Sequence, residues 1–528
     1  MPPPAGPDPQ RGTAVPPRPA VPVRVPLAGA EPAPSAAGPA AAPSAAGRHR
    51  YGPARHLPVA LLVTAFAVYF AIASIRSYEG YGQPAFDLGI FDQGLWLLSR
   101  FHAPFVTVMG RNLFGDHTSF ILLPLVPLYW IDPDVRLLLA VQACAVAAAA
   151  IPVYLLALRR LGSSLLATLF AAALLCSPAL QNGLLEQFHP EALLVLTLSL
   201  ALYAAIESKG RLLAVAAMLS LLAKEDVAVY ILPLGLWVLL RRDRRWGAAL
   251  MAGAAAWTAF AYGVVIREIL GTAGFYADRL PFGGITGTLV EPFRRPGAFV
   301  RYLAGGGRPF YLMQLGTSVG WVFAVGPEMA AIALPAALEN VISNDPYMHQ
   351  VIYHYSMPIA PVLVFGTIWA VSRLGAAWMR RVATVLVLAS AVASSALWGL
   401  APWSRQVPTP AWSPTSPFAR GADALEARIP PHAAVSAWYP FVAHLDHRTQ
   451  IYLWPTPFSA EYWGLFTQDG QRLPAAGSIT YVLLPAQLSS AQDRRVLRSI
   501  LPQFAPVARR GGVVLYERVT GRPGLHGP

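Results

Sequence analysis

The sequence contains few charged residues. Only 13% of its 528 residues are Asp, Glu, Lys or Arg, whereas 55% are hydrophobic, and the mean hydropathy is +0.46. A soluble protein of this length would not carry so many long apolar runs with so few charges between them. The scarcity of charge therefore excludes an ordinary soluble enzyme and predicts an integral membrane protein.

Cysteine is also scarce. Cys144 and Cys176 both lie inside apolar runs, where we expect small buried hydrophobic residues rather than partners in a disulfide. The sequence has no H-E-x-x-H pattern of the kind that binds zinc. It has no obvious internal repeat either, which argues against a transporter built from inverted halves.

Acidic residues are outnumbered by basic ones, which gives a formal net charge of +13. Such an excess often indicates nucleic-acid binding. Here, however, much of it lies in short clusters between apolar runs, at residues 159–160, 209–211, 241–245 and 380–381. Membrane proteins carry such clusters on the cytoplasmic side. We therefore expect membrane lipids, and no nucleic acid, as partners.

The composition divides the chain into three regions. Residues 1–56 are rich in proline and alanine, which cannot build a core, and are predicted to form a disordered cytoplasmic tail. Residues 57–400 carry the long apolar runs and form the predicted membrane domain. Residues 401–528 contain strand-like runs at 433–437, 450–453, 479–484 and 513–518 and helix-like runs at 423–428 and 493–501. This third region predicts an α/β domain.

The membrane domain is predicted to be α-helical and polytopic, with about eleven transmembrane helices. The predicted spans are residues 57–75, 135–158, 164–180, 192–206, 212–223, 227–240, 246–266, two within 311–342, 357–371 and 382–400. Gly326-Pro327 is expected to separate the two spans within 311–342. Residues 76–133 form a predicted outer loop, in which the apolar run 120–130 is too short to span.

The basic clusters orient the predicted helices. A cytoplasmic N-terminus places all four clusters in the cytoplasm and leaves the C-terminal α/β domain outside the cell membrane. The arginine-rich segment 267–308 is the exception, because it falls on the outer side. We expect a multi-pass protein of the plasma membrane with an extracytoplasmic C-terminal domain.

Most of the polar residues next to apolar runs fall on that same outer side. Polar groups at membrane depth are costly and tend to be functional. Their one-sided placement, from distant parts of the sequence, predicts one reaction or binding centre. The residues concerned are Asp87, Asp92, Asp116, His117, His189, Glu191, Lys224, Glu225, Asp226, His349 and His354.

The first motif is F-D-L-G-I-F-D-Q, at residues 86–93. If this segment is helical, Asp87 and Asp92 lie about 140° apart around the axis and cannot both face one small site. Asp87, just beyond the first span, is the better candidate for a general base or a metal ligand. The alternative is an N-cap aspartate that begins an amphipathic helix.

Two further motifs combine a carboxylate with an imidazole. In G-D-H, Asp116 could cap the following helix or, with His117, hold a metal ion. In H-P-E, Pro190 and Glu191 suit the first turn of a helix, as capping would require. Capping does not explain His189, which leaves it as a candidate site residue.

The motif K-E-D places three ionisable residues between two short apolar runs. Lys224 could bind a phosphate, and Glu225 and Asp226 could pair with it or bind a cation. The alternative is a turn that neutralises itself. His349 and His354 flank an outer turn, where an ordinary surface pair is the simpler interpretation.

Together, D-L-G-I-F-D-Q, G-D-H, H-P-E, K-E-D and H-Y-S-x-P (residues 354–358) resemble a family of bacterial multi-pass membrane proteins of unknown function. The resemblance runs from about residue 57 to the end and includes residues 429–437 and 480–484. That family is in turn similar to the C-type (GT-C) integral-membrane glycosyltransferases. This similarity implies an acidic residue in the first outer loop, which Asp87 matches, and a polyprenyl-phosphate sugar donor.

The sequence therefore favours a glycosyltransferase that moves a sugar from a polyprenyl-phosphate donor to an extracytoplasmic acceptor. Asp87 would accept the acceptor's proton. Asp116 and His117 would hold a divalent cation such as Mg²⁺ or Mn²⁺. The predicted substrate-binding residues are His189, Glu191, Lys224, Glu225, Asp226 and His354. The alternatives are a transporter or lipid flippase, with K-E-D as an ion or proton relay, and a non-catalytic envelope scaffold.

Overall fold

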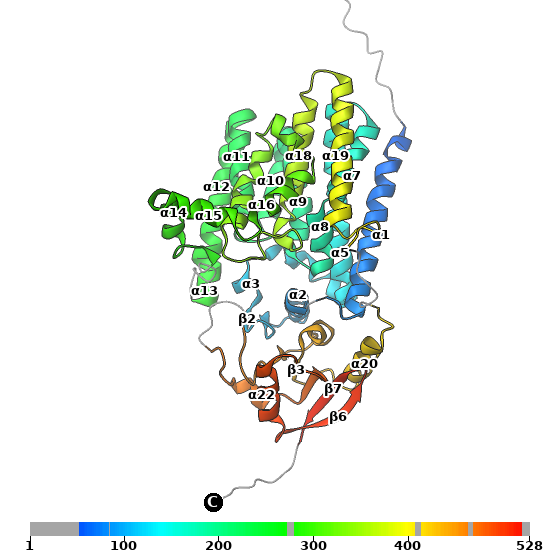
Figure 1. Cartoon of the computed structure of the whole chain (residues 1–528), viewed down its shortest axis with the longest axis vertical. Helices are drawn as coiled ribbons and strands as arrows, with labels where there is room; N and C mark the ends of the chain where they lie inside the picture. The colour runs from blue at the N-terminus through cyan, green and yellow to red at the C-terminus, as the bar shows by residue number, and fades with distance from the viewer. Residues whose placement is uncertain (1–51, 84, 272–278, 407–412, 463–467, 520–528) are drawn as a thin grey trace, which may run out of the picture. The chain divides into compact units, whose positions relative to one another are not determined.

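The computed structural model describes residues 52–83, 85–271, 279–406, 413–462 and 468–519. Residues 1–51, which hold nearly all of the predicted disordered tail, lie outside the described residues. The contacts within the chain separate Met1–Gly52 from Pro53–Pro528. Helices dominate the second of these units, and a small sheet lies in its C-terminal part (Figure 1).

A body of apolar helices forms the larger part of this unit. Its helices are α1 (Leu57–Glu79), α5 (Val135–Ala148), α6 (Ala150–Leu161), α7 (Ser164–Leu175), α8 (Pro178–Glu186), α9 (Pro190–Ile206), α10 (Gly210–Leu221), α11 (Ala228–Arg241), α12 (Arg244–Phe260), α13 (Arg267–Leu270), α14 (Ile285–Arg294), α15 (Pro296–Ala304), α16 (Arg308–Thr317), α17 (Leu334–Ile342), α18 (Ile359–Ser372) and α19 (Ala377–Trp398). In the most apolar stretch of each candidate span, the buried share is 83% for the span that contains α18, but only 22% for α1, 22% for α12 and 28% for α19. Apolar helices that stay this exposed need lipid around them, as expected of a membrane protein.

Five helical stretches of the described chain are long and apolar enough to cross a membrane: Ala54–Glu79, Val135–Leu161, Arg244–Leu270, His354–Ser372 and Ala377–Trp398. A sixth span is formed if α7 and α8, which bend by 46° at their junction, cross as one unit. The predicted spans around α9, α10 and α11 are apolar helices of only 10–17 residues. The structure therefore supports a polytopic helical membrane protein, whereas the number of eleven transmembrane helices stays a prediction.

The apolar run 311–342 differs from the prediction of two regular helices. Helix α16 ends at Thr317, and two short 3-10 helices, Val322–Val325 and Ala330–Ala333, come before α17. Gly320 adopts a positive φ of 62°, which helps to end the regular helix before Gly326-Pro327 is reached. The break therefore begins earlier, and is longer, than the proline alone predicts.

The predicted outer loop, residues 76–133, forms short elements that pack under the helical body. They are α2 (Ala85–Ser99), strands β1 (Phe105–Val106) and β2 (Arg111–Asn112), α3 (Leu113–Asp116), the 3-10 helix Phe120–Leu125 and α4 (Leu128–Ile131). The two strands pair antiparallel. The run 120–130 is a 3-10 helix followed by one turn of α-helix, which agrees with the expectation that it is too short to span.

The C-terminal part holds a five-stranded sheet in the order β4-β3-β5-β7-β6. The strands are β3 (Val435–Ala437), β4 (Ile451–Leu453), β5 (Tyr481–Pro485), β6 (Phe504–Arg510) and β7 (Val513–Arg518), and the helices are α20 (Pro417–Glu426), α21 (Val442–Leu445) and α22 (Ala491–Ile500). Strand β3 runs parallel to β4 and β5, whereas β7 is antiparallel to β5 and β6. Four of these strands overlap the strand-like runs of the sequence; β6 was not predicted.

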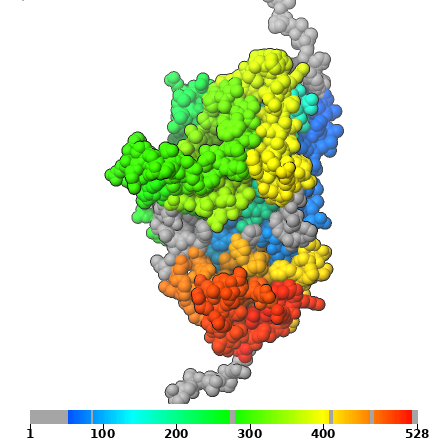
Figure 2. Space-filling view, viewed as in Figure 1, coloured from blue at the N-terminus to red at the C-terminus, as the bar shows by residue number. Residues whose placement is uncertain are grey.

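The C-terminal part packs directly on the end of α1 and on the segment that follows it (Figure 2). The ring of His444 is stacked between those of Tyr78 and Tyr81, at centroid distances of 4.1 and 4.0 Å. Burial lowers the pKa of His444 to about 3, so this ring is neutral. The hydroxyl of Tyr81 donates to Asp423 of α20 at 2.7 Å. These contacts join the C-terminal part to the end of α1 and to the short connection between α1 and α2.

Candidate active site

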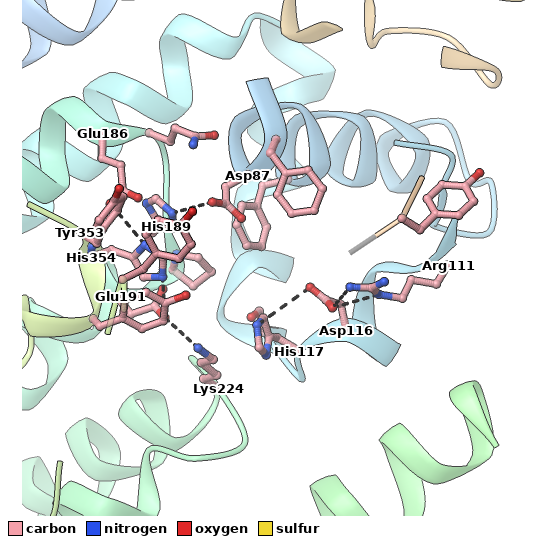
Figure 3. Close-up of a pocket in the computed structure, with 18 of the residues that line it drawn as sticks. Asp87, Arg111, Asp116, His117, Glu186, His189, Glu191, Lys224, Tyr353 and His354 are labelled. Carbon is pink, nitrogen blue, oxygen red and sulfur yellow. Dashed lines mark hydrogen bonds and ion pairs between the residues drawn. The ribbon is translucent and has the colours of Figure 1, made fainter. Parts of the chain in front are cut away.

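A cavity of about 580 Å³ lies at one end of the helical body. Glu186 ends α8, His189 and Glu191 begin α9, Lys224 lies between α10 and α11, and His354 precedes α18. These positions lie at or between helix ends, and their side chains line one common cavity. The segment 76–133 adds Asp87, Arg111, Asp116 and His117 (Figure 3). The C-terminal part adds Tyr439, Leu453, Glu461 and Tyr462.

Asp87 and His189 form the first contact across the cavity. Asp87 lies in the first turn of α2, whose Leu88 N–H donates to the side chain of Gln187 at 2.9 Å. The Nε2 of His189 is 3.2 Å from Oδ2 of Asp87. Burial opposes ionisation of both groups, but the hydrogen bond and charge of His189 outweigh it and lower the pKa of Asp87. Asp87 is therefore ionised at neutral pH.

His189 is 2% exposed and carries the opposite shift. Burial works to lower its pKa, but the charge of Glu186, followed by the hydrogen bond and charge of Asp87, raises the pKa to about 9. Its ring stacks on that of His354 at a centroid distance of 3.7 Å. His354 in turn contacts Glu186 through Nδ1, at 3.3 Å. The Asp87 carboxylate is thus held by a packed chain of imidazoles and carboxylates.

Lys224 and Glu191 form a buried ion pair on the same wall. The Nζ of Lys224 is 3.2 Å from Oε1 of Glu191 and 3.8 Å from Oδ2 of Asp226. Oε1 of Glu191 also lies 4.0 Å from Nε2 of His354. Lys224, the catalytic candidate Asp87 and the predicted substrate-binding residue His189 therefore belong to one connected network. Asp226 contacts this network through Lys224 and does not itself line the cavity among the described residues.

Arg111 and Glu225 hold the G-D-H motif in place. Arg111 forms a short ion pair with Asp116 and is only 4% exposed. The Nδ1 of His117 is 2.8 Å from Oε1 of Glu225, whose other oxygen accepts the backbone N–H of Thr118 at 3.1 Å. Glu225 therefore lies behind His117 and supports it, rather than lining the cavity.

Two groups of residues offer ligands for a cation in the cavity. One oxygen of Glu186 and one nitrogen each of His189 and His354 lie within 4.8 Å of one another. The predicted pair, Asp116 and His117, lies 3.9 Å apart, but Asp116 already pairs with Arg111. A cation bound by the first group would have to displace the proton that the raised pKa places on His189.

Two further residues singled out in the sequence, Asp92 and His349, also lie outside the cavity lining. Asp92 faces away from the cavity, toward Tyr129 and His447, as the angle between it and Asp87 requires. His349 lies outside the cavity lining, whereas His354 lines it. The interpretation of these two histidines as a surface pair is wrong, because they are only 4% and 8% exposed.

Several lining residues were not assigned from the sequence. Arg111 and Glu186 lie just before the G-D-H and H-P-E motifs, so their proximity to these motifs was the available signal. Arg279 comes from the arginine-rich segment that opposes the positive-inside pattern. Tyr439, Glu461 and Tyr462 belong to the C-terminal part, and no local pattern connects them to the cavity.

The chain is thus a helical membrane protein with a cavity lined by charged residues at one end of its helix body. Residues 83–501 match the family described as predicted membrane protein (DUF2079), and the chain belongs to this family. The comparison with curated proteins found no match. Among solved structures, the chain is similar to ArnT from Cupriavidus metallidurans in the apo state, with 13% identity and a TM-score of 0.48 over 87% of this chain and 98% of that one.

Proposed function

We propose that the protein is a membrane glycosyltransferase that moves a sugar from a polyprenyl-phosphate donor to an acceptor outside the cytoplasm. The observation that carries the proposal is one cavity that combines the ionised carboxylate of Asp87 with the cationic side chains of Lys224, Arg111 and Arg279. A transferase of this class needs both a base for the acceptor and positive charge for the departing phosphate. The similarity of the family to C-type glycosyltransferases supports the same chemistry.

The proposed reaction uses Asp87 as the general base. The acceptor hydroxyl donates its proton to a carboxylate oxygen of Asp87 while the hydroxyl oxygen attacks the anomeric carbon of the sugar. The bond between that carbon and the phosphate oxygen breaks, and polyprenyl phosphate leaves with the electron pair. The hydrogen bond from His189 orients the Asp87 carboxylate and keeps it ionised before the acceptor binds.

The cationic residues would stabilise the leaving phosphate. Lys224 is buried, so its attraction to a phosphate is less weakened by water than that of a surface lysine. Arg111 offers a planar guanidinium, which suits phosphate oxygens. Three of the predicted substrate-binding residues would support other side chains rather than contact the sugar. Glu191 and Asp226 would hold Lys224 in position, and Glu225 would hold His117. His354 would support His189 through the ring stack.

The cavity has a suitable size. Its volume of about 580 Å³ lies in the range of small-ligand sites and can accept a sugar phosphate together with part of an acceptor. Tyr439, Tyr355 and Tyr462 line it and offer ring faces and hydroxyls of the kind that bind sugars. The polyprenyl chain would remain among the membrane lipids, beside the apolar helices of the body.

A divalent cation such as Mg²⁺ or Mn²⁺ at Asp116 and His117 stays a prediction. The guanidinium of Arg111 already pairs with the Asp116 carboxylate at this position without a metal ion. The group Glu186, His189 and His354 offers the ligand types of a transition-metal site. The proposed reaction takes no step through either cation.

The proposed location is the plasma membrane, with the N-terminus in the cytoplasm and the cavity and the C-terminal part outside. The basic clusters at residues 159–160, 209–211, 241–245 and 380–381 support this orientation. Glu207, which Arg160 approaches to 2.9 Å, caps the C-terminal end of α9, whereas His189 caps its N-terminal end. The acceptor would therefore be a molecule of the cell envelope.

The deciding experiment gives purified protein radiolabelled polyprenyl-phosphate sugars and measures release of polyprenyl phosphate with an acceptor present. Transfer from at least one donor, lost in Asp87→Asn, would support the proposal. Movement of a solute or lipid in proteoliposomes without transfer would instead establish the transporter or flippase alternative. A scaffold would show neither activity and would tolerate loss of the buried charges.

A further inference from the structure

A second cluster of ionisable side chains lies outside the cavity, where α2 meets the C-terminal part. Asp92 comes from α2, and Asp446 and His447 directly follow α21. One oxygen of each aspartate and one imidazole nitrogen all lie within 4.8 Å of one another. The two aspartates are only 1% and 2% exposed. The cluster therefore places two buried carboxylates beside one imidazole whose side chain is partly exposed.

The hydrogen bonds of the cluster leave part of it without a donor. Asp92 accepts a short hydrogen bond from Tyr129 through Oδ1, and its Oδ2 lies 3.0 Å from Nε2 of His447. Oδ2 of Asp446 has no hydrogen-bond donor among the described residues. The neighbouring guanidinium of Arg448 donates to three backbone carbonyls instead. Two buried carboxylates at this distance repel one another unless a proton or a cation lies between them.

The imidazole is held in a fixed orientation. The ring of His447 stacks on that of Trp96 at 5.9 Å, with an angle of 13° between the planes. The ring of Tyr129 meets it edge-on at 6.2 Å. Such packing restricts rotation of the ring and so fixes the direction of its nitrogen atoms before a ligand arrives.

We propose that Asp92, Asp446 and His447 bind one divalent transition-metal ion, with Zn²⁺ as the best fit. Two carboxylate oxygens and one imidazole nitrogen form a mixed set that suits Zn²⁺ better than Mg²⁺, which prefers six oxygen ligands. Ligand atoms around a tetrahedral Zn²⁺ lie ~3.4 Å apart, so the three groups need to move only slightly. The His447 side chain is 32% exposed, which leaves room for a water as fourth ligand.

The ion would join the C-terminal part to the helix that carries the proposed base. Asp87 lies in the first turn of α2, and Asp92 follows on the opposite side of the same helix. The next residue, Gln93, donates to the carbonyl of Arg448 at 3.0 Å, so hydrogen bonds already connect the two parts here. Asp92 is in this sense a positioning residue, which fixes α2 from the side that faces away from the cavity.

The competing state has a proton instead of a metal ion. Burial, and then the charge of Asp92, would raise the pKa of Asp446 well above its ordinary range in that case. A protonated Asp446 could donate to Asp92 and needs no metal ion. Metal content therefore separates the two states directly.

The test measures metal in the purified full-length chain. Protein purified without chelators is equilibrated with Zn²⁺, freed of excess by gel filtration, and analysed by mass spectrometry of its metals. The wild-type protein should retain about one equivalent of Zn²⁺ per chain, bound at the cluster. This Zn²⁺ should be lost in His447→Ala and in the isosteric Asp446→Asn, and retained in His432→Ala, an exposed histidine of the same region.

A second control separates this site from the cavity. His354→Ala removes a ligand of the cavity group and should leave the cluster's equivalent in place. Zn²⁺ should also raise the unfolding temperature of wild-type protein stripped with chelator, and should do so far less in Asp446→Asn. The proposal is overturned if wild-type protein holds no Zn²⁺ after equilibration, or if only His354→Ala loses it. These results do not depend on any transfer activity.

Discussion

The Nε2 of His189 lies 3.2 Å from Oδ2 of Asp87, although 102 residues separate them in the sequence. This contact connects the first turn of α2 to the N-terminus of α9. It brings an ionised carboxylate and a protonated imidazole to the wall of one cavity.

Replacing Asp87 by Asn should stop transfer and leave donor binding largely intact. The amide keeps the shape of the side chain but cannot accept the acceptor's proton, and loss of a general base costs about 10²- to 10⁴-fold in rate. Release of polyprenyl phosphate and equilibrium binding of the donor are measured on the same preparation. Asp132→Asn, at an exposed aspartate of the outer segment, is the matched control. Full activity of Asp87→Asn would remove Asp87 from the mechanism.

Replacing Lys224 by Met should weaken donor binding and also destabilise the protein. Breaking a buried ion pair leaves an uncompensated charge, here on Glu191, at a cost of about 3–5 kcal/mol. The double variant Lys224→Met with Glu191→Gln removes both charges and should recover much of the stability. It should not recover donor binding, because the cation for the phosphate is still missing. Donor affinity that returns along with stability would make Lys224 a structural residue.

Replacing Glu426 by Gln should make the protein more stable at pH 8 than the wild type. Burial, and then the charge of Asp423, raises the pKa of Glu426 from 4.5 to about 8 in the folded state. The folded state therefore keeps a proton that the unfolded state loses, and stability falls as the pH rises from 4.5 to 8. Gln cannot lose this proton and should gain at most about 4–5 kcal/mol at pH 8, because each pKa unit between 4.5 and 8 is worth about 1.4 kcal/mol.

Thermal unfolding of the wild type and Glu426→Gln between pH 4.5 and 8 checks this difference. The two curves should converge at the acidic end of the range. Glu517→Gln, at an exposed glutamate of β7, should leave the pH dependence unchanged. A constant offset between the wild type and Glu426→Gln at every pH would mean that the substitution acts by packing and not by ionisation.

Single cysteines at Ser208 and Ser489 should report opposite sides of the membrane. Both serines are exposed, the first between α9 and α10 and the second just before α22. Both native cysteines are first replaced by alanine, because Cys144 is exposed. In intact cells, an impermeant thiol reagent should label the cysteine at Ser489 and spare the one at Ser208. The reverse pattern would place the cavity in the cytoplasm and exclude an extracytoplasmic acceptor.

Much of the candidate site could be predicted from local sequence because its residues lie at helix ends. An ionisable residue cannot easily sit in the middle of an apolar helix, so Glu191 and Lys224 had to lie near the ends. The five-residue spacing of Asp87 and Asp92 already implied that they face different ways. The structure agrees, since Asp87 lines the cavity and Asp92 contacts His447.

The sequence by itself thus determined the membrane character, the three compositional regions and most of the polar residues that lie at helix ends. These features depend on composition and on the spacing of residues close together in the chain. Only the tertiary structure decided which side chains contact one another across distant segments. Arg111 on Asp116, Glu186 on His354 and the lining by Tyr439 all depend on how the chain folds back. The same holds for strand β6, which needs β7 beside it to form a strand. Contacts between distant segments are set by packing of the whole chain, and no local pattern contains them.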